Sequence, residues 1–473
     1  MKIANKTVSA ERLVKDALEK AKFFEDYHIF NYLNEEGALK KAREIDARIK
    51  KGEKVGKLAG VPYALKDNFL TPEGETTASA HILQGFTSPI TATAVAKLEA
   101  EDAIMIGRAN LDAFAHGSST ENSYFGPTSN AFDKTRVAGG SSGGSAVAVA
   151  LDIVEFATGT DTGGSIRQPA SFNGVYGFKP TFGTISRYGV VAMASSTDCI
   201  GFFTKTPEDM DLLMSIASGQ DSKDLTTLPD YYNEEKDSLV ATEATAKSSE
   251  QLVPNAPHRI GIIKDFDNDS VNPEIRQALK DKCDELKKKG HEIVELSMPN
   301  LKYALAAYYI IVPAEVASNL SRYDGVRYGF RSEKSKDLAS LYNDTRNEGF
   351  MPENKRRIMI GNFVLSSGFY DAYFLKAAKA RTLIIDEYEK AFKKCDFILT
   401  PVSPNLAFKI GEKVNDPVSM YLEDVMSVPL NLAGIPGLTV PVGKSKEGLP
   451  VGLQLIGPRR SDKSLIRFSK ELA

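Results

Sequence analysis

The chain has 473 residues, of which 42% are apolar and 26% are charged, the proportions of an ordinary soluble globular protein. Its formal net charge of −3 gives no basic surplus for binding nucleic acid, and no run approaches the ~18 apolar residues that a membrane span needs. The first ten residues also lack the apolar core of a signal peptide, so we expect a cytoplasmic protein that does not contact membranes.

The three cysteines are far apart and form neither a C-x-x-C pair nor a cluster with histidine. We therefore expect Cys199, Cys283 and Cys395 to be reduced core residues, with no metal site in this chain.

Helical and strand patterns alternate along the first third of the chain. The expected elements are, in order, a helix over 10–21 capped by Ser9, a helix over about 36–50 ended by Gly52, a buried strand over 60–66, a helix over 92–100, a short apolar run at 104–107, and further segments at 146–151 and 153–157.

The clearest unit is strand, helix, strand over residues 258–296. Asn272 caps its helix, Pro273 takes the first helical position and Gly290 ends it, between strands at 259–263 and 292–296. Such a unit implies parallel strands covered on both faces. Later we expect a helix over about 370–394 and strands over 396–401, 438–442 and 451–456.

Together these patterns predict an α/β fold with a mixed, mainly parallel central sheet covered by helices on both faces. We expect one domain over residues 1–473. Residues 221–257 are polar and lack periodicity, which indicates a surface loop or excursion.

Two glycine-rich segments, 137–146 and 159–167, place Ser141 and Ser165 in backbone that can approach a ligand closely. Glycine also lets backbone N–H groups point at a developing negative charge, as acyl transfer requires. The alternative is an anion cradle for phosphate. However, the chain has no G-x-x-x-x-G-K-[ST] segment, and the serine segments do not match G-x-G-x-x-G.

A serine nucleophile needs a base, and histidine is scarce. Of five histidines, only His116 lies among glycine and serine, and we interpret it as a packed or surface residue. Lys66 ends an apolar strand; by itself it would be interpreted as a salt-bridged lysine. Burial can lower a lysine pKa by as much as ~3–5 units, which makes a Ser-Ser-Lys relay possible.

Lys66, the segment 139–145 and the segment 161–167 resemble the motifs of the amidase signature family in order and spacing. The resemblance implies the amidase signature fold, with Lys66 as base, Ser141 as a bridging serine after a cis peptide bond, and Ser165 as the acyl-forming nucleophile. It also implies an oxyanion hole from the amides of Thr162, Gly163 and Gly164.

Within that family, the chain most resembles the glutaminase subunits of tRNA-dependent amidotransferases, through segments 111–128, 175–189, 318–327 and 355–361. A zwitterionic substrate needs an arginine for its carboxylate and an acid for its ammonium. The resemblance assigns these roles to Arg357, with Arg356 as the alternative, and to Asp424.

The same resemblance implies that ammonia from glutamine passes to a B subunit, where ATP and Mg²⁺ activate misacylated Glu-tRNA(Gln) or Asp-tRNA(Asn). A small C subunit would hold the A and B subunits together. Two rival hypotheses are a free-standing amidase for small or aryl amides and a silent scaffold subunit. The intact Lys66, Ser141 and Ser165 count against the scaffold.

Overall fold

The computed structural model describes residues 8–234, 257–266 and 268–472. Within these ranges eleven strands form one sheet, in the order β1-β3-β2-β4-β6-β5-β10-β11-β9-β7-β8. The strand bounds are Phe30–Leu33 (β1), Pro62–Lys66 (β2), Ile104–Ala109 (β3), Phe156–Asp161 (β4), Tyr176–Lys179 (β5), Cys199–Thr204 (β6), Arg259–Ile263 (β7), Glu292–Leu296 (β8), Phe397–Pro401 (β9), Gly437–Lys444 (β10) and Pro450–Ile456 (β11).

The sheet is mixed, which confirms the expected α/β class. Strands β3, β2 and β4 are mutually parallel neighbours, and so are β9, β7 and β8. Between these groups, β4, β6, β5, β10, β11 and β9 pair antiparallel, and β1 pairs antiparallel with β3 at one edge. Parallel direction therefore holds within the two groups and not across the middle, where β10 and β11 are joined by a short hairpin connection.

Alternate side chains of the strands enter two separate cores. Tyr63 and Leu65 of β2 belong to one buried cluster, whereas Ala64 between them belongs to the other. Phe202 and Phe203 of β6 divide in the same way. This period-two pattern requires apolar cover on both faces of the sheet, as expected.

Helices supply that cover. One core includes buried residues of α1, α2, α4 and α5, and the other includes residues of α3, α6, α7, α8, α11, α13 and α14. Their bounds are Ala10–Phe23 (α1), Glu35–Lys50 (α2), Thr93–Ala100 (α3), Gly143–Ala150 (α4), Arg167–Asn173 (α5), Pro207–Ala217 (α6), Pro273–Lys288 (α7), Ala304–Asn319 (α8), Lys376–Ala391 (α11), Val428–Ala433 (α13) and Asp462–Phe468 (α14). Three further helices are Leu338–Gly349 (α9), Pro352–Leu365 (α10) and Pro417–Leu422 (α12).

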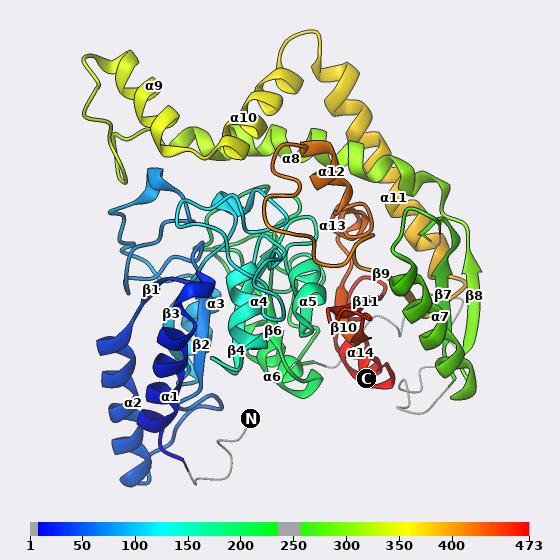
Figure 1. Ribbon diagram of the computed structural model, residues 1–473, viewed down its shortest axis with the longest axis horizontal. Helices are drawn as coiled ribbons and strands as arrows, with labels where there is room; N and C mark the ends of the chain where they lie inside the picture. Colours follow the sequence, from blue (N-terminus) through cyan, green and yellow to red (C-terminus); the bar gives the residue numbers. More distant parts are fainter. Residues whose placement is uncertain (1–7, 235–256, 267, 473) are drawn as a thin grey trace.

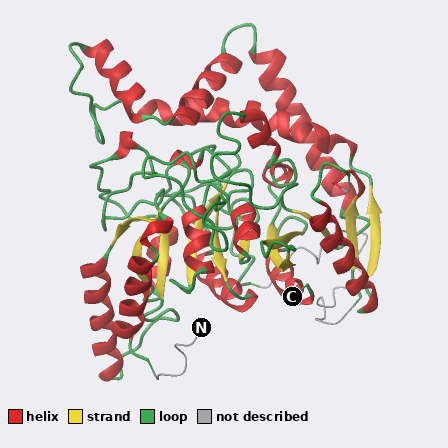
Figure 2. Cartoon of the chain, viewed as in Figure 1, coloured by secondary structure: helices red, strands yellow, loops and turns green. Residues whose placement is uncertain are grey.

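Helices α8, α10 and α11 lie along the upper side of the molecule in Figure 1, with α8 packed against both others. Loops gather between these helices and the sheet, as Figure 2 shows. These loops carry the serine segments, so the candidate site lies where strand ends meet the upper helices.

Most expected elements are confirmed within one or two residues at their ends. Ser9 accepts a hydrogen bond from Arg12 N and Asn272 accepts one from Glu274 N, as their predicted capping roles require. The helix expected over 370–394 differs at its start, because Tyr370–Leu375 (η9) is π-helical before α11 begins.

The predicted surface excursion at 221–257 is described only at its two ends. The described part lies at the surface, with Leu225 exposed, and is anchored at two points: Tyr231 and Tyr232 are buried, and Asp221 accepts hydrogen bonds from Thr93 and Ser186. Residues 235–256 lie outside the described residues.

The three cysteines are free and buried, which confirms their interpretation as reduced core residues. Among the helices that the structure describes, none has the length and apolar character to cross a bilayer.

Candidate active site

Lys66 ends strand β2 and delivers its amine into a cluster of hydroxyl groups. Its Nζ lies 2.9 Å from Ser141 Oγ, 2.7 Å from Ser142 Oγ and 2.7 Å from Thr160 Oγ1. All four residues are buried, and the Gly140–Ser141 peptide bond is cis, as expected. The structure thus joins the predicted base to the predicted bridging serine.

Burial brings the deprotonation of Lys66 into the neutral pH range. Burial lowers the pKa of Lys66 to about 7, although the nearby carboxylates of Asp112, Asp161 and Asp198 act in the opposite direction. An amine with a pKa near 7 has a lone pair available at neutral pH, so Lys66 can accept a proton there.

Ser165 lies in the turn that follows strand β4, and it is 8% exposed. Its carbonyl oxygen accepts a hydrogen bond from Ser142 N at 3.2 Å, which holds the two serine segments side by side. Within the described residues, the Ser165 hydroxyl has no hydrogen-bond partner. It is the residue of the relay whose oxygen remains open to a ligand.

A buried ion pair fixes this turn. Arg167 bonds to both carboxylate oxygens of Asp161 at 3.0 Å and also donates to Ser427 O, Asn431 Oδ1 and Gln454 Oε1. Arg167 and Asp161 are fully buried, and the guanidinium is a main reason that the pKa of Asp161 is held far below its usual range, against the effect of burial. The turn is therefore tied to the C-terminal part of the chain.

The predicted oxyanion donors differ in their availability. The Gly164 N–H donates to Asp161 Oδ1 at 2.9 Å, so it is already engaged. The amides of Thr162 and Gly163 lie beyond the end of β4 and donate no hydrogen bond within the described residues. Gly164 has a φ of +139°, and a Cβ at this position would collide with Ser427 Oγ, so its contribution is to shape the turn.

Arg357 and Asp424, which are far apart in sequence, meet around Tyr309. The Arg357 guanidinium lies over the Tyr309 ring at 5.2 Å, and the Tyr309 hydroxyl donates to Asp424 at 3.0 Å. Ser118 also donates to both oxygens of Asp424, at 2.8 and 2.9 Å. The structure thus brings together the two charges that the sequence suggested for a zwitterion.

Arg357 and Asp424 are both buried, and burial changes the pKa of Asp424. Arg357 is 2% exposed, and Glu353 accepts from its Nε at 2.9 Å. Arg356 instead lies on the exposed side of α10 and pairs with Glu353 there. Both arginines line the cavity described below, but only Arg357 is buried. Burial raises the pKa of Asp424 to about 7, while the bonds from Ser118 and Tyr309 oppose that rise.

Ser427 connects this charged pair to the nucleophile turn. Its hydroxyl donates to Gly163 O at 2.6 Å, and its N–H donates to Asp424 O at 3.1 Å. Tyr308, the neighbour of Tyr309, lies against Gly163 so closely that a Cβ there would collide with its ring. The segment that carries Ser165 and the pair of Arg357 and Asp424 are therefore connected through Ser427 and α8.

A cavity of about 220 Å³ opens beside Arg357. Its lining includes Asp112, His116, Ser118, Glu353 and Tyr421. Asp424 and Ser165 are not in that lining, so the cavity borders Arg357 and does not extend to them.

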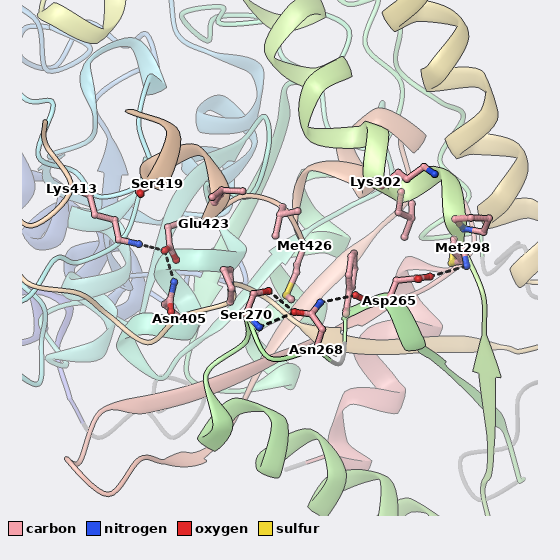
Figure 3. Close-up of a pocket in the computed structure, with 16 residues that line it drawn as sticks. Asp265, Asn268, Ser270, Met298, Lys302, Asn405, Lys413, Ser419, Glu423 and Met426 are labelled. Atoms are coloured by element: carbon pink, nitrogen blue, oxygen red, sulfur yellow. Dashed lines mark hydrogen bonds and ion pairs between the residues drawn. The ribbon is translucent and has the colours of Figure 1, made fainter. Parts of the chain in front are cut away.

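A second cavity, of about 520 Å³, does not contain the predicted chemistry. Lys413 lines both cavities. Figure 3 shows that polar groups of the second cavity pair with one another: Glu423 accepts from Asn405 and Lys413, and Asn268 bonds to Ser270. The larger volume of this cavity therefore does not coincide with the predicted residues.

His116 is fully buried, so its interpretation as a packed residue holds and a surface position does not. Burial and the charge of Arg357 hold the pKa of His116 well below its usual value. Across the described ranges, no three His, Cys, Asp or Glu side chains gather as ligands for a metal ion.

Sequence reasoning missed several residues that the site uses. These are Ser142 and Thr160 around the lysine, and Ser118, Tyr308, Tyr309, Glu353, Tyr421 and Ser427 around the charged pair. Ser142 and Thr160 lay within the two glycine-rich segments and Ser118 within the segment 111–128, so these three could have been named, whereas the others have no local signal.

Comparison with known proteins identifies the family of this chain. A family profile described as Amidase matches residues 12–466. A Cyanothece sp. protein named as the A subunit of glutamyl-tRNA(Gln) amidotransferase is 48% identical, over 96% of this chain and 92% of that protein. A Clostridium acetobutylicum protein named as A subunit 2 of glutamyl-tRNA(Gln) amidotransferase is 46% identical, over 99% of this chain and 96% of that protein.

Solved structures also match. The structure of the glutamyl-tRNA(Gln) amidotransferase A subunit from Thermotoga maritima has a TM-score of 0.71 and 41% identity, over 89% of this chain and 84% of that chain. A structure described as an amidase has a TM-score of 0.81 and 30% identity, over 99% of this chain and 96% of that chain. Since the profile covers nearly the whole sequence and the relatives share the fold, the chain belongs to the amidase family.

Proposed function

We propose that this chain is the glutaminase subunit of a tRNA-dependent amidotransferase. The observation that carries the proposal is the meeting of Arg357 and Asp424 around Tyr309, next to the Ser165 turn. A buried guanidinium and a buried carboxyl at one end of a serine site suit a free amino acid with a side-chain amide. The similarity to proteins named as amidotransferase A subunits supports the same substrate.

The proposed reaction begins when neutral Lys66 takes a proton from Ser141, which takes one from Ser165. The Ser165 oxygen then attacks the carboxamide carbon of glutamine, and the amides of Thr162 and Gly163 stabilise the oxyanion. Catalytic hydrogen bonds often tighten only when substrate is bound, so a Ser165 hydroxyl without a partner is compatible with this path.

The relay then returns the proton to the departing nitrogen, the C–N bond breaks, and ammonia leaves. Water attacks the resulting ester, with the relay again as base, and releases glutamate and free Ser165. Every proton is accounted for by Lys66, Ser141 and water.

We further propose that the ammonia serves a multi-subunit enzyme. A B subunit would bind ATP, Mg²⁺ and the misacylated Glu-tRNA(Gln) or Asp-tRNA(Asn), and a small C subunit would hold the A and B subunits together. The net charge of −3 gives this chain no electrostatic reason to bind tRNA by itself. The continuous sheet supports a single amidase domain over residues 1–473.

The rival is a free-standing amidase for small or aryl amides, which would use the same three catalytic residues. It gives no reason to bury Arg357 and Asp424 beside the nucleophile. A preference for glutamine over an amide that lacks both the α-amino and the α-carboxylate group separates the two hypotheses.

The nucleophile is tested by exposing the full chain to an electrophilic glutamine analogue and measuring its intact mass. We expect one adduct on wild type and on Ser171→Ala, a control in α5, and none on Ser165→Ala. An adduct on Ser165→Ala at the wild-type level would contradict the assignment. A wild-type chain without any adduct would favour the silent scaffold.

A further inference from the structure

His116 has a ring nitrogen that the proposed relay does not use. The residue is 0% exposed and lies in the loop between Ala113 and Ser118, and it lines the 220 Å³ cavity together with Arg357. Its Nε2 is buried and has no hydrogen-bond partner in the described chain. An unpartnered polar atom in a protein interior is costly, so its environment calls for an explanation.

The neighbours of His116 determine which nitrogen carries the proton. Asn354 Oδ1 accepts from Met351 N at 3.2 Å, so its Nδ2 is the donor, and this Nδ2 bonds to Ala113 O at 2.8 Å. The same Nδ2 lies 2.8 Å from His116 Nδ1, which must therefore accept. A neutral imidazole has one N–H, so the proton is on Nε2, which makes this nitrogen an unused donor.

The backbone holds the ring in this position. Phe114 and Ala115, the two residues before His116, have φ values of +55° and +63°, in the left-handed region that residues with side chains rarely adopt. The His116 carbonyl also accepts from Asn122 Nδ2 at 2.9 Å. The loop that carries the ring is thus fixed, Asn354 holds the ring at Nδ1, and Nε2–H is left as a donor on a residue that lines the cavity.

The charges around the cavity indicate what this donor would bind. Arg357 lies nearby, and its charge and the burial of His116 keep the ring neutral. Glu353 already occupies Arg357 Nε, which leaves the outer guanidinium nitrogens for a ligand. A neutral N–H beside a guanidinium matches an anion with two oxygens.

We propose that His116 is a specificity-determining residue whose Nε2–H donates to the α-carboxylate that Arg357 binds. This inference rests on the proposed function, because it takes a free amino acid as the substrate. Arg357 supplies the charge, and His116 supplies a directed hydrogen bond that an amide without a carboxylate cannot use.

Two substitutions separate the two ring nitrogens. In His116→Asn, the amide oxygen can replace Nδ1 as the acceptor for Asn354, but the Nε2 donor is lost. In His116→Gln, the longer side chain returns an N–H near the Nε2 position, but the acceptor for Asn354 is lost. A role in holding Asn354 and a role in binding the carboxylate therefore predict opposite rankings.

Binding is measured by calorimetry on the full chain carrying Ser165→Ala, with L-glutamine and with L-glutamine amide, in which the carboxylate is replaced by a carboxamide. We expect His116→Asn to raise the Kd of L-glutamine about tenfold and to leave that of the amide unchanged. His116→Gln should retain most of the affinity for L-glutamine.

Equal losses for both ligands, no loss, or a larger loss in His116→Gln would each overturn the role of His116. Turnover of L-glutamine by the wild-type chain is measured separately, and its absence contradicts the proposed function. If the Ser165→Ala chain binds no L-glutamine, both proposals fail.

Discussion

The two halves of the site are built in different ways. The relay of Lys66, Ser141 and Ser165 comes from one strand end and two glycine-rich segments, and backbone hydrogen bonds hold those segments together. The charged pair of Arg357 and Asp424 comes from α10 and the turn after α12, and a third helix, α8, joins them through Tyr309. The proposed relay therefore lies at a strand end and in two turns, one of which is tied to the C-terminal part of the chain through Arg167, whereas the proposed substrate-selecting pair depends on the packing of α8 against α10 and the turn after α12.

The largest expected effect is on the relay. Lys66→Met should lower kcat/KM by about 10²- to 10⁴-fold, the usual contribution of a positioned acid or base, for glutamine and for an amide without the amino-acid groups alike. Steady-state ammonia release measures both values. Lys179→Met is the matched control, because Lys179 is equally buried but bonds to Pro180 O outside the relay. An equal loss of kcat/KM in Lys179→Met would mean that both substitutions act by disturbing the fold and that Lys66 is not the base.

The next largest effect should distinguish the proposed relay from the charged pair of Arg357 and Asp424. Asp424→Asn removes a charge that matters only when the substrate carries an ammonium group, and such buried bonds are worth ~1.5–3 kcal/mol. We expect about a tenfold to hundredfold loss in kcat/KM for glutamine and little change for an amide without the α-amino group. If both substrates lose by the same factor, Asp424 is structural and the free-standing amidase becomes the better hypothesis.

A smaller effect should separate the two neighbouring arginines. Arg357→Lys keeps the charge but loses the planar fork, and we expect about a tenfold rise in the KM for glutamine. Arg356→Ala changes an exposed ion pair with Glu353, and we expect less than about a twofold change. If Arg356→Ala has the larger effect on the KM for glutamine, Arg356 and not Arg357 binds the carboxylate.

The mildest test uses pH. Lys66 and Asp424 both have a pKa of about 7, and both must be deprotonated to act on glutamine. Below pH 7, log kcat/KM for glutamine should therefore rise with pH at a slope approaching about 2. For an amide without the α-amino group, the slope should approach about 1, because only Lys66 must lose its proton. In Asp424→Asn the slope for glutamine should fall to about 1. Identical slopes in wild type for the two substrates would mean that deprotonation of Asp424 is not required for glutamine to react.

The sequence predicted the relay far better than the charged pair. Glycine segments and an apolar strand ending in lysine are local signals, and in the structure Lys66 lies against Ser141 while Ser142 N donates to Ser165 O. The Gly164 amide was predicted as an oxyanion donor, but Asp161 takes it, because a carboxylate accepts several turn amides at once. No local pattern could show that competition.

The fold was also predictable only in part. Helix α7 has a cap, a starting proline and an apolar face, and its bounds agree with the expectation. Helix α8 is apolar on every side and contains Pro313, so it lacks the periodicity that marks a helix, although it carries Tyr308 and Tyr309. The antiparallel middle of the sheet depends on pairings between distant segments, which the strand patterns do not specify.

The hydrogen bonds of Arg167 to the C-terminal part of the chain have a consequence for the order in which the site is assembled during synthesis. Lys66, Ser141 and Ser165 all lie in the first 165 residues, but the arginine that orients the nucleophile turn bonds to Ser427, Asn431 and Gln454. A nascent chain that has not yet reached β11 would hold every catalytic side chain without the partners that align them. We therefore expect the alignment of the Ser165 turn to be completed only after synthesis has reached residue 454.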